Sequence, residues 1–182
     1  HVQRRDATQV HVVLGGPAPR QLDADREALA VATTLLGGGM SSRLFQKVRE
    51  ELGLAYTVYS YTDTQADTGR HGIYVATNPK QGDAALAVVL DELAQVAGGA
   101  MTDDEIAAGV SQLKGQTVLS LDGLGARLYR AAGVALYDEP YKSLAELLAE
   151  LDAVTPARVR AACAAYLDPA RQYILTLGPT RA

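Results

Sequence analysis

The sequence predicts an α+β fold, in which a mixed, mainly antiparallel sheet is covered by helices on one face, as a single domain over residues 1–182. Strand-like runs rich in β-branched and aromatic residues occur at four places: 9–14, 54–61, 70–77 and 171–177. The short polar stretch 62–69 predicts that the second and third of these strands form an antiparallel hairpin. Runs with apolar residues at helical spacing fill most of the remaining chain.

The composition of the chain limits the classes of function that it can have. With 182 residues, 48% hydrophobic and 21% charged, the chain suits one globular domain. Its formal net charge is −4, so it lacks the concentrated positive field that nucleic-acid binding needs. No uncharged run reaches the ~20 apolar residues that span a membrane. The single cysteine, Cys163, cannot form an internal disulfide, which fits a reducing, cytoplasmic (bacterial-type) location. Because the chain begins at His1 without methionine, we expect it to be a piece of a longer protein.

The stretch 35–60 combines a glycine triplet, a short amphipathic helix, a turn and a strand. A helix beginning at Asp23 is expected to end at Gly37, Gly38 and Gly39 in the left-handed geometry that glycine adopts most cheaply. The next helix, 42–52, has one apolar stripe and is capped by Gly53; the stripe contains Leu44, Phe45, Val48 and Leu52. In the strand that follows, alternation places Tyr56 with Val58 on one face.

The remaining chain is predicted to be mostly helical, with a closing strand. Helices are expected over 83–97 and 124–136, and from three capped starts at Thr102, Ser143 and Thr155. The first two starts form capping boxes with Glu105 and Glu146, and Pro156 occupies the first turn of the third helix.

The usual catalytic constellations are missing from the sequence. The three histidines are far apart, and neither HExxH nor HxxEH occurs, so we expect no metal in this chain. A Ser-His-Asp triad cannot be judged from spacing, but no GxSxG elbow marks a nucleophile. We expect His11 and His71 to be strand histidines that are solvent-facing or hydrogen-bonded, and Cys163 to be a small core residue.

Residue patterns alone do not decide whether the residues of the stretch 35–60 have structural or functional roles. The glycine triplet follows a helix and precedes no GK[ST], so it is a helix stop and not a phosphate cradle. Arg49 lies in the last turn of its helix, where the helix dipole favours a cation. Tyr56 fits equally as an aromatic packed on the sheet.

The string LGGGMSSRLFQKVREELGLAYTVYS, however, strongly resembles the second half of the insulinase and mitochondrial-processing-peptidase family of zinc metallopeptidases, the inverse HxxEH family. The resemblance covers nearly the whole chain. Further matching positions are the strand with Gln9 and His11, the segment 74–79, the acidic helix start at Thr102 and the end at 177–179.

The resemblance implies two homologous α+β halves that close around a peptide. The first half carries the zinc and a glutamate base, and the second supplies an arginine and a tyrosine seven residues apart, matched here by Arg49 and Tyr56. These two are the expected catalytic residues, which stabilise the transition state and hold the substrate backbone. Gly37, Gly38 and Gly39 resemble a short form of a glycine-rich loop that contacts substrate.

The same resemblance also implies that this chain has no catalytic activity of its own. The HxxEH half is absent, so this chain is expected to be inactive alone, with no cofactor of its own and zinc in the N-terminal half. Its expected partners are that half and a peptide substrate, with pairing of two copies by analogy. Glycines at 123 and 125 depart from the expected continuous helix. Two alternatives stay open, an inactive scaffold relative and an unrelated α+β ligand-binding domain.

Overall fold

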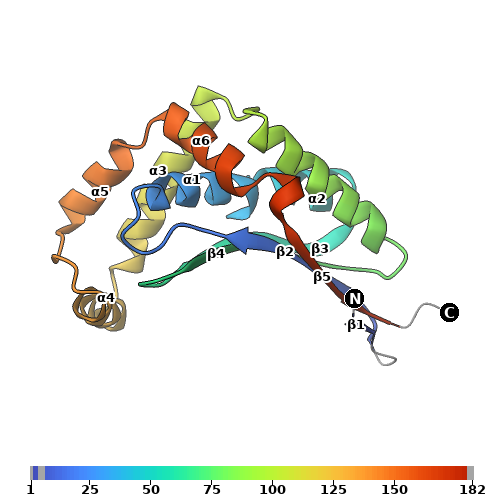
Figure 1. Cartoon of the computed structure of the whole chain (residues 1–182), viewed down its shortest axis with the longest axis horizontal. Helices are drawn as coiled ribbons and strands as arrows, with labels where there is room; N and C mark the ends of the chain where they lie inside the picture. The colour runs from blue at the N-terminus through green and yellow to red at the C-terminus, as the bar shows by residue number, and fades with distance from the viewer. Residues whose placement is uncertain (1, 4–6, 180–182) are drawn as a thin grey trace.

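The computed structural model describes residues 2–3 and 7–179 and shows one five-stranded sheet with most of its helices on one face (Figure 1). The strand order is β1-β5-β2-β4-β3, in which β1 runs parallel to β5 and the other pairs are antiparallel. The strands are β1 Val2–Gln3, β2 Val10–Pro17, β3 Ala55–Thr64, β4 Gly69–Thr77 and β5 Tyr173–Gly178. The predicted mixed, mainly antiparallel α+β fold is therefore confirmed.

The helices follow the predicted order, and both predicted capping boxes are present. They are α1 Arg26–Gly37, η1 Phe45–Glu51, α2 Gly82–Ala97, α3 Asp103–Ser120, α4 Leu124–Leu136, α5 Leu144–Asp152, α6 Pro156–Tyr166 and the short η2 Pro169–Arg171. Helix α1 begins later than predicted because Asp23 closes a turn, accepting a hydrogen bond from the Arg20 backbone N–H at 2.9 Å. The glycines near 123 separate α3 from α4, so the helix is interrupted there.

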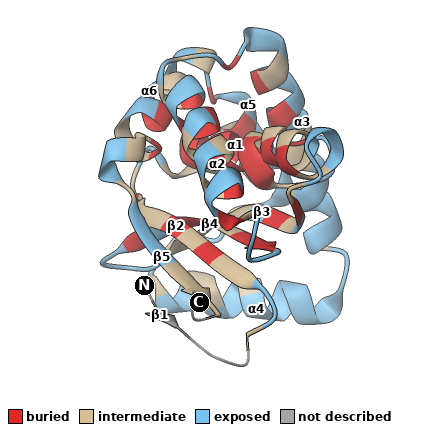
Figure 2. Ribbon diagram, turned by 90° about the vertical axis from the view of Figure 1, so that its right-hand side faces the viewer, coloured by how far each residue is buried: buried red, intermediate tan, exposed pale blue. Residues whose placement is uncertain are grey.

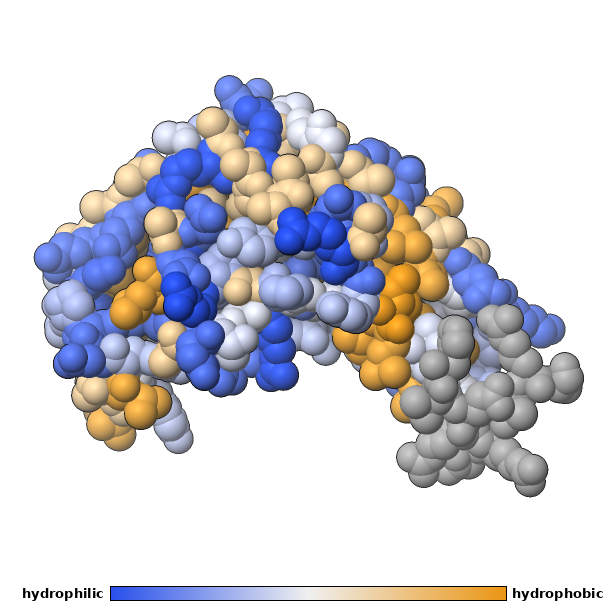
Figure 3. Space-filling model, in the orientation of Figure 1, coloured by the Kyte–Doolittle hydropathy of each residue, from blue (hydrophilic) through white to orange (hydrophobic). Residues whose placement is uncertain are grey.

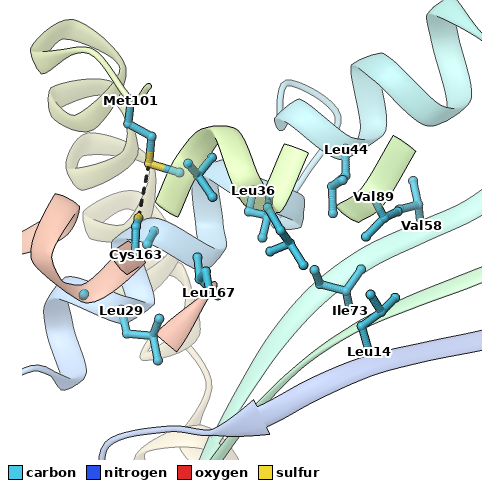
Figure 4. Close-up of a cluster of buried hydrophobic side chains, with 14 of the residues drawn as sticks. Leu14, Leu29, Leu36, Leu44, Val58, Ile73, Val89, Met101, Cys163 and Leu167 are labelled. Carbon is cyan, nitrogen blue, oxygen red and sulfur yellow. Dashed lines mark hydrogen bonds between the residues drawn. The ribbon is translucent and has the colours of Figure 1, made fainter. Parts of the chain in front are cut away.

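The core fills the space between the sheet and helices α1, α2 and α6 (Figures 2 and 4). Alternate strand residues point into it, and the fully buried ones include Val12, Leu14, Ile73 and Val75. Cys163 belongs to this core, as predicted, with its Sγ 3.9 Å from Met101 Sδ. None of the described helices is long and apolar enough to cross a membrane.

The predicted left-handed end of α1 is wrong. Among the described glycines, only Gly53 and Gly99 have positive φ. Gly37 is required for space instead, since a Cβ on it would lie 2.5 Å from the backbone nitrogen of Ser60 on β3. Helix α1 therefore packs directly on the sheet at this point, through a residue without a side chain.

Candidate functional site

Arg49 lies in a helix that is wider than the predicted α-helix. Segment η1 is a π-helix, and the Leu52 N–H donates to Lys47 O, five residues back, at 3.2 Å. Leu44 and Val48 are fully buried and anchor the segment, whereas Leu52 is 46% exposed and does not continue the predicted stripe. Single-turn π-helices of this kind occur frequently at functional sites.

Tyr56 follows a tight turn and lies in a β-bulge. Gly53 adopts φ +57°, and the Leu54 N–H donates to Val48 O at 2.8 Å, which brings β3 back beside η1. Ala55 and Thr57 pair with the consecutive residues Thr77 and Ala76, so Tyr56 is the extra residue of the strand.

The predicted alternation is consequently wrong at this point. Tyr56 is 76% exposed, while Val58 is buried, so the two do not share a face. The bulge presents the Tyr56 side chain to solvent instead of to the core, and bulges are over-represented next to active sites for this ability to re-aim a side chain.

The structure brings Arg49 and Tyr56 together. The Arg49 guanidinium carbon lies 4.4 Å from the centroid of the Tyr56 ring and 4.7 Å from that of Phe45. Both contacts are close enough for cation–π attraction, worth ~0.5–1 kcal/mol each at a partly exposed site. Within the described part of the chain, the Tyr56 hydroxyl has no hydrogen-bond partner. Stacking engages the faces of the guanidinium, and at its edge Arg49 Nε lies 3.5 Å from Glu50 Oε1. Within the described part of the chain, its two Nη groups stay available for acceptors.

A polar cluster centred on Arg43 fixes the start of this segment to two other helices. Arg43 Nε donates to Glu105 Oε1 at 3.1 Å on α3, and Arg43 Nη1 lies 3.5 Å from Glu92 Oε2 on α2. Desolvation by itself raises the pKa of Glu105, but the backbone hydrogen bond from Thr102 and the charge of Arg43 outweigh it and lower the pKa. The sequence did not indicate this cluster, because its members are about 50 and 60 residues apart in the chain.

The glycine triplet lies at the end of α1, before η1. Gly37 is buried against β3, whereas Gly38 and Gly39 are partly exposed. Gly39 O accepts hydrogen bonds from the Ser42 hydroxyl at 2.5 Å and the Ser42 N–H at 3.1 Å. The substrate contact expected at these three glycines stays a prediction.

An aromatic cluster on the sheet surface was not recognised from the sequence. The Tyr59 ring lies 5.1 Å from Tyr74 and 6.2 Å from Tyr61, and the Tyr74 hydroxyl lies 2.7 Å from His11 Nδ1. The register pairs Tyr59 with Tyr74 across β3 and β4, and only this pairing reveals the cluster. A correct strand alignment would have been the necessary signal.

The residues present do not form a metal site. Among residues 2–3 and 7–179, no group of three or more His, Cys, Asp or Glu side chains could hold a metal ion. His71 is buried and bonded to Pro17 O and Gln172 Oε1, which confirms a structural strand histidine. Burial raises the pKa of the Cys163 thiol to about 11, so it is a poor nucleophile at neutral pH.

The fold defines an α+β domain in which helices α1, α2 and α6 pack on one face of a five-stranded sheet. A family model described as the peptidase M16 inactive domain matches residues 1–113, and the chain belongs to this zinc-protease family.

Related proteins carry the name of zinc protease. The chain is 44% identical over 177 residues to an uncharacterized zinc protease of Streptomyces coelicolor, covering 97% of this chain and 38% of that protein. It is 39% identical over 175 residues to another from Mycobacterium tuberculosis, covering 96% of this chain and 40% of the relative. The chain thus spans about two fifths of the length of these relatives.

Solved structures share the fold. The peptidase M16 inactive domain from Pseudomonas fluorescens superposes with a TM-score of 0.86 at 25% identity, covering 100% of this chain and 43% of that chain. The inactive peptidase domain of a Bordetella parapertussis putative zinc protease superposes with a TM-score of 0.83 at 18% identity, covering 100% of this chain and 99% of that chain. The second likeness shows the fold alone.

Proposed function

We propose that this chain completes the peptide-binding cleft of a zinc endopeptidase by docking on a metal-bearing half. The observation that carries the proposal is the Arg49 guanidinium stacked on the exposed Tyr56 ring. The π-helix η1 and the β-bulge at Tyr56 meet at this pair. The names of the relatives agree with this assignment.

In this proposal Tyr56 serves the reaction directly. Attack of water on a peptide carbonyl builds negative charge on the carbonyl oxygen, and the phenol O–H donates a hydrogen bond to that oxygen. Because the Tyr56 hydroxyl has no partner in the described part of this chain, no existing hydrogen bond must be broken first. The metal and the glutamate base belong to the other half.

Arg49 serves binding and orientation. Contacts with the Phe45 and Tyr56 rings hold the guanidinium in place, while its two Nη groups donate to backbone carbonyls of the peptide. The same stacking limits movement of the Tyr56 ring, so Arg49 also positions the phenol. In this proposal Gly38 and Gly39 lie at the rim of the cleft formed with the other half, where their partly exposed backbone contacts substrate.

The test is reconstitution. The chain is mixed with the metal-bearing half of its parent protein and zinc, and cleavage of a quenched fluorescent peptide library is followed. Cleavage is expected only when both halves are present. If both halves bind each other but no peptide is cleaved, and the metal-bearing half has an intact HxxEH, the enzymatic role is wrong and a scaffold role replaces it.

A further inference from the structure

Arg43 lies between the glycine triplet and η1, and its side chain is largely covered by protein. Hydrophilic side chains are common on the outer surface of the molecule (Figure 3), where water solvates them, whereas the Arg43 side chain is only 22% exposed. An arginine covered to this extent needs partners for its N–H groups. Three segments distant from it in the sequence provide them: helix α2, helix α3 and the loop between these helices.

The Arg43 guanidinium forms a fork with one carboxylate on α3. Arg43 Nε donates to Glu105 Oε1 and Nη2 donates to Glu105 Oε2, each at 3.1 Å. Nη2 also donates to Ala100 O at 3.1 Å, and Nη1 lies 3.5 Å from Glu92 Oε2 on α2. Two N–H···O bonds to one carboxylate fix a direction as well as a distance. Lysine does not reproduce this geometry, because its ammonium group has no planar fork.

Glu105 is itself held in place, so the fork is anchored to a fixed point. Glu105 Oε2 accepts a hydrogen bond from the Thr102 backbone N–H at 2.8 Å, and it thus closes the capping box of α3 while it binds Arg43. Gln112, seven residues further along the helix, donates from its Nε2 to Gly38 O at 3.4 Å. Because residues seven apart lie on the same side of a helix, one face of α3 contacts both the glycine triplet and the start of η1.

The side chains of the candidate site follow Arg43 closely in the chain. Phe45 comes two residues later, and its ring contacts the Arg49 guanidinium. Leu44 and Val48 are fully buried and also anchor this segment. Apolar contacts are not directional, so they tolerate small shifts of η1 along and about its axis. The fork at Arg43 opposes such shifts at the end of η1 from which Phe45 extends.

We propose that Arg43 is a positioning residue for the pair Arg49 and Tyr56. Its fork with Glu105 fixes the start of η1 and thereby places the Phe45 ring. That ring, together with the Tyr56 ring, holds the Arg49 guanidinium. A displacement of about 1 Å at a group that orients substrate costs on the order of 100-fold in rate. The effect on catalysis rests on the proposed function, whereas the placement of the Arg49 guanidinium is measured on this chain without the other half.

The first test measures that placement by NMR. Ring currents of the two aromatic neighbours shield the Arg49 Nε–H proton, so its signal is expected upfield of those of exposed arginines, and its loss in Arg49→Lys assigns it. In Arg43→Lys the signal should move downfield, toward the exposed arginines. Arg160→Lys is the matched control, because Arg160 donates to Met101 O and to Asp103 at the same end of α3, and it should leave the signal unchanged.

Glu105→Gln is an independent variant that leaves Arg43 in place. Glutamine keeps an acceptor for the Thr102 N–H but has only one oxygen, so it cannot accept both N–H groups of the fork. Glu146→Gln makes the same change in the capping box of α5 and is its control. Glu105→Gln should move the Arg49 signal downfield, and Glu146→Gln should leave it in place, with circular dichroism showing that each chain is folded.

The second test follows catalysis in the reconstituted enzyme. Arg43→Lys should lower kcat about 10- to 100-fold, and Arg160→Lys should not. In a chain that also carries Tyr56→Phe, Arg43→Lys should lower kcat less than about threefold, because the phenol O–H that it positions is already missing. Equal effects of Arg43→Lys in the two backgrounds would overturn the proposal, because they would show a general loss of structure.

The two tests separate this proposal from the proposed function. An Arg49 signal that stays in place in folded Arg43→Lys and Glu105→Gln chains rules out positioning, whatever the reconstituted enzyme does. A signal that moves while kcat of Arg43→Lys equals that of wild type also contradicts it. If the signal moves and the wild-type reconstituted enzyme cleaves nothing, the proposed function fails, and Arg43 is still the residue that places the Arg49 guanidinium.

Discussion

The guanidinium carbon of Arg49 lies between two aromatic rings, 4.7 Å from the Phe45 centroid and 4.4 Å from the Tyr56 centroid. Phe45 and Arg49 are one helical turn apart on η1, and Tyr56 reaches them across the turn at Gly53. The cation thus joins a helix to a strand at the point where both are irregular. This contact fixes the relative orientation of the two polar groups that the proposed function requires.

Tyr56→Phe should reduce turnover without unfolding the chain. The substitution keeps the ring and its stacking on Arg49 but removes the O–H donor, so kcat of the reconstituted enzyme should fall about 100- to 1,000-fold with little change in KM. Steady-state cleavage of a fluorogenic peptide measures both. Tyr59→Phe, on the same strand, is the control and should retain activity; an unchanged kcat for Tyr56→Phe removes the assigned role.

Arg49→Lys should weaken substrate binding and also loosen the site. Lysine keeps the charge but loses the planar fork that stacks and donates in pairs. We expect KM to rise about tenfold, and the free energy of unfolding of the chain alone to fall by about 1 kcal/mol. Lys47→Arg, two residues away in the same helix and with a side chain that is 43% exposed, should change neither quantity. Equal KM values for Arg49→Lys and wild type would contradict the binding role.

Gly37→Ala should destabilise the fold by about 2 kcal/mol, because the new Cβ would overlap the Ser60 backbone nitrogen 2.5 Å away. Gly115→Ala is the matched control. It lies within α3, its Cβ would meet nothing within 4 Å, and it should stabilise by about 0.5–1 kcal/mol. Urea unfolding of both variants measures the change in the free energy of unfolding and its sign. A Gly37→Ala chain as stable as wild type would show that the α1–β3 contact is looser than described.

Arg43→Met should cost about 3 kcal/mol, because it leaves the buried Glu92 carboxylate without its counter-ion. Arg20→Met removes an exposed pair with Asp23 and should lower the free energy of unfolding far less, because solvent screens exposed charges. The folded-state pKa of Glu105 is lowered, so its contribution is present above the unfolded-state pKa and is lost as pH falls through the folded value.

The Arg43→Met variant should accordingly show a weaker loss of stability on acidification than wild type. Urea unfolding at a series of acidic pH values gives, for each chain, the slope of the free energy of unfolding against pH. Identical slopes would mean that Arg43 does not lower the pKa of Glu105.

Cys163 should resist alkylation until the chain unfolds. Its thiol is buried and its pKa is raised from 9.0 to about 11, so little thiolate forms in the folded state near neutral pH. Between these two values the unfolded chain loses its proton first, so folding stability should fall as pH rises through this interval. Thiol labelling with and without urea measures access, and rapid labelling of the native chain would show that the α6 core opens.

Much of the fold follows from local sequence. Alternating β-branched runs located four of the strands, and glycine and proline positions set their ends within a few residues. Thr102 with Glu105 and Ser143 with Glu146 cap their helices by contacts three residues apart, which a sequence displays directly. The resemblance of residues 36–60 to a peptidase half also selected Arg49 and Tyr56 before any geometry was known.

The sequence by itself therefore determined the α+β architecture, the missing HxxEH motif and the two candidate site residues, because each depends on neighbours in the chain. Only the tertiary structure decided how Arg49 and Tyr56 meet, since the π-helix and the bulge depend on how η1 and β3 pack on the core and on β4. It also decided why Gly37 must be glycine and that Tyr59 meets Tyr74, because those depend on contacts between segments distant in the chain.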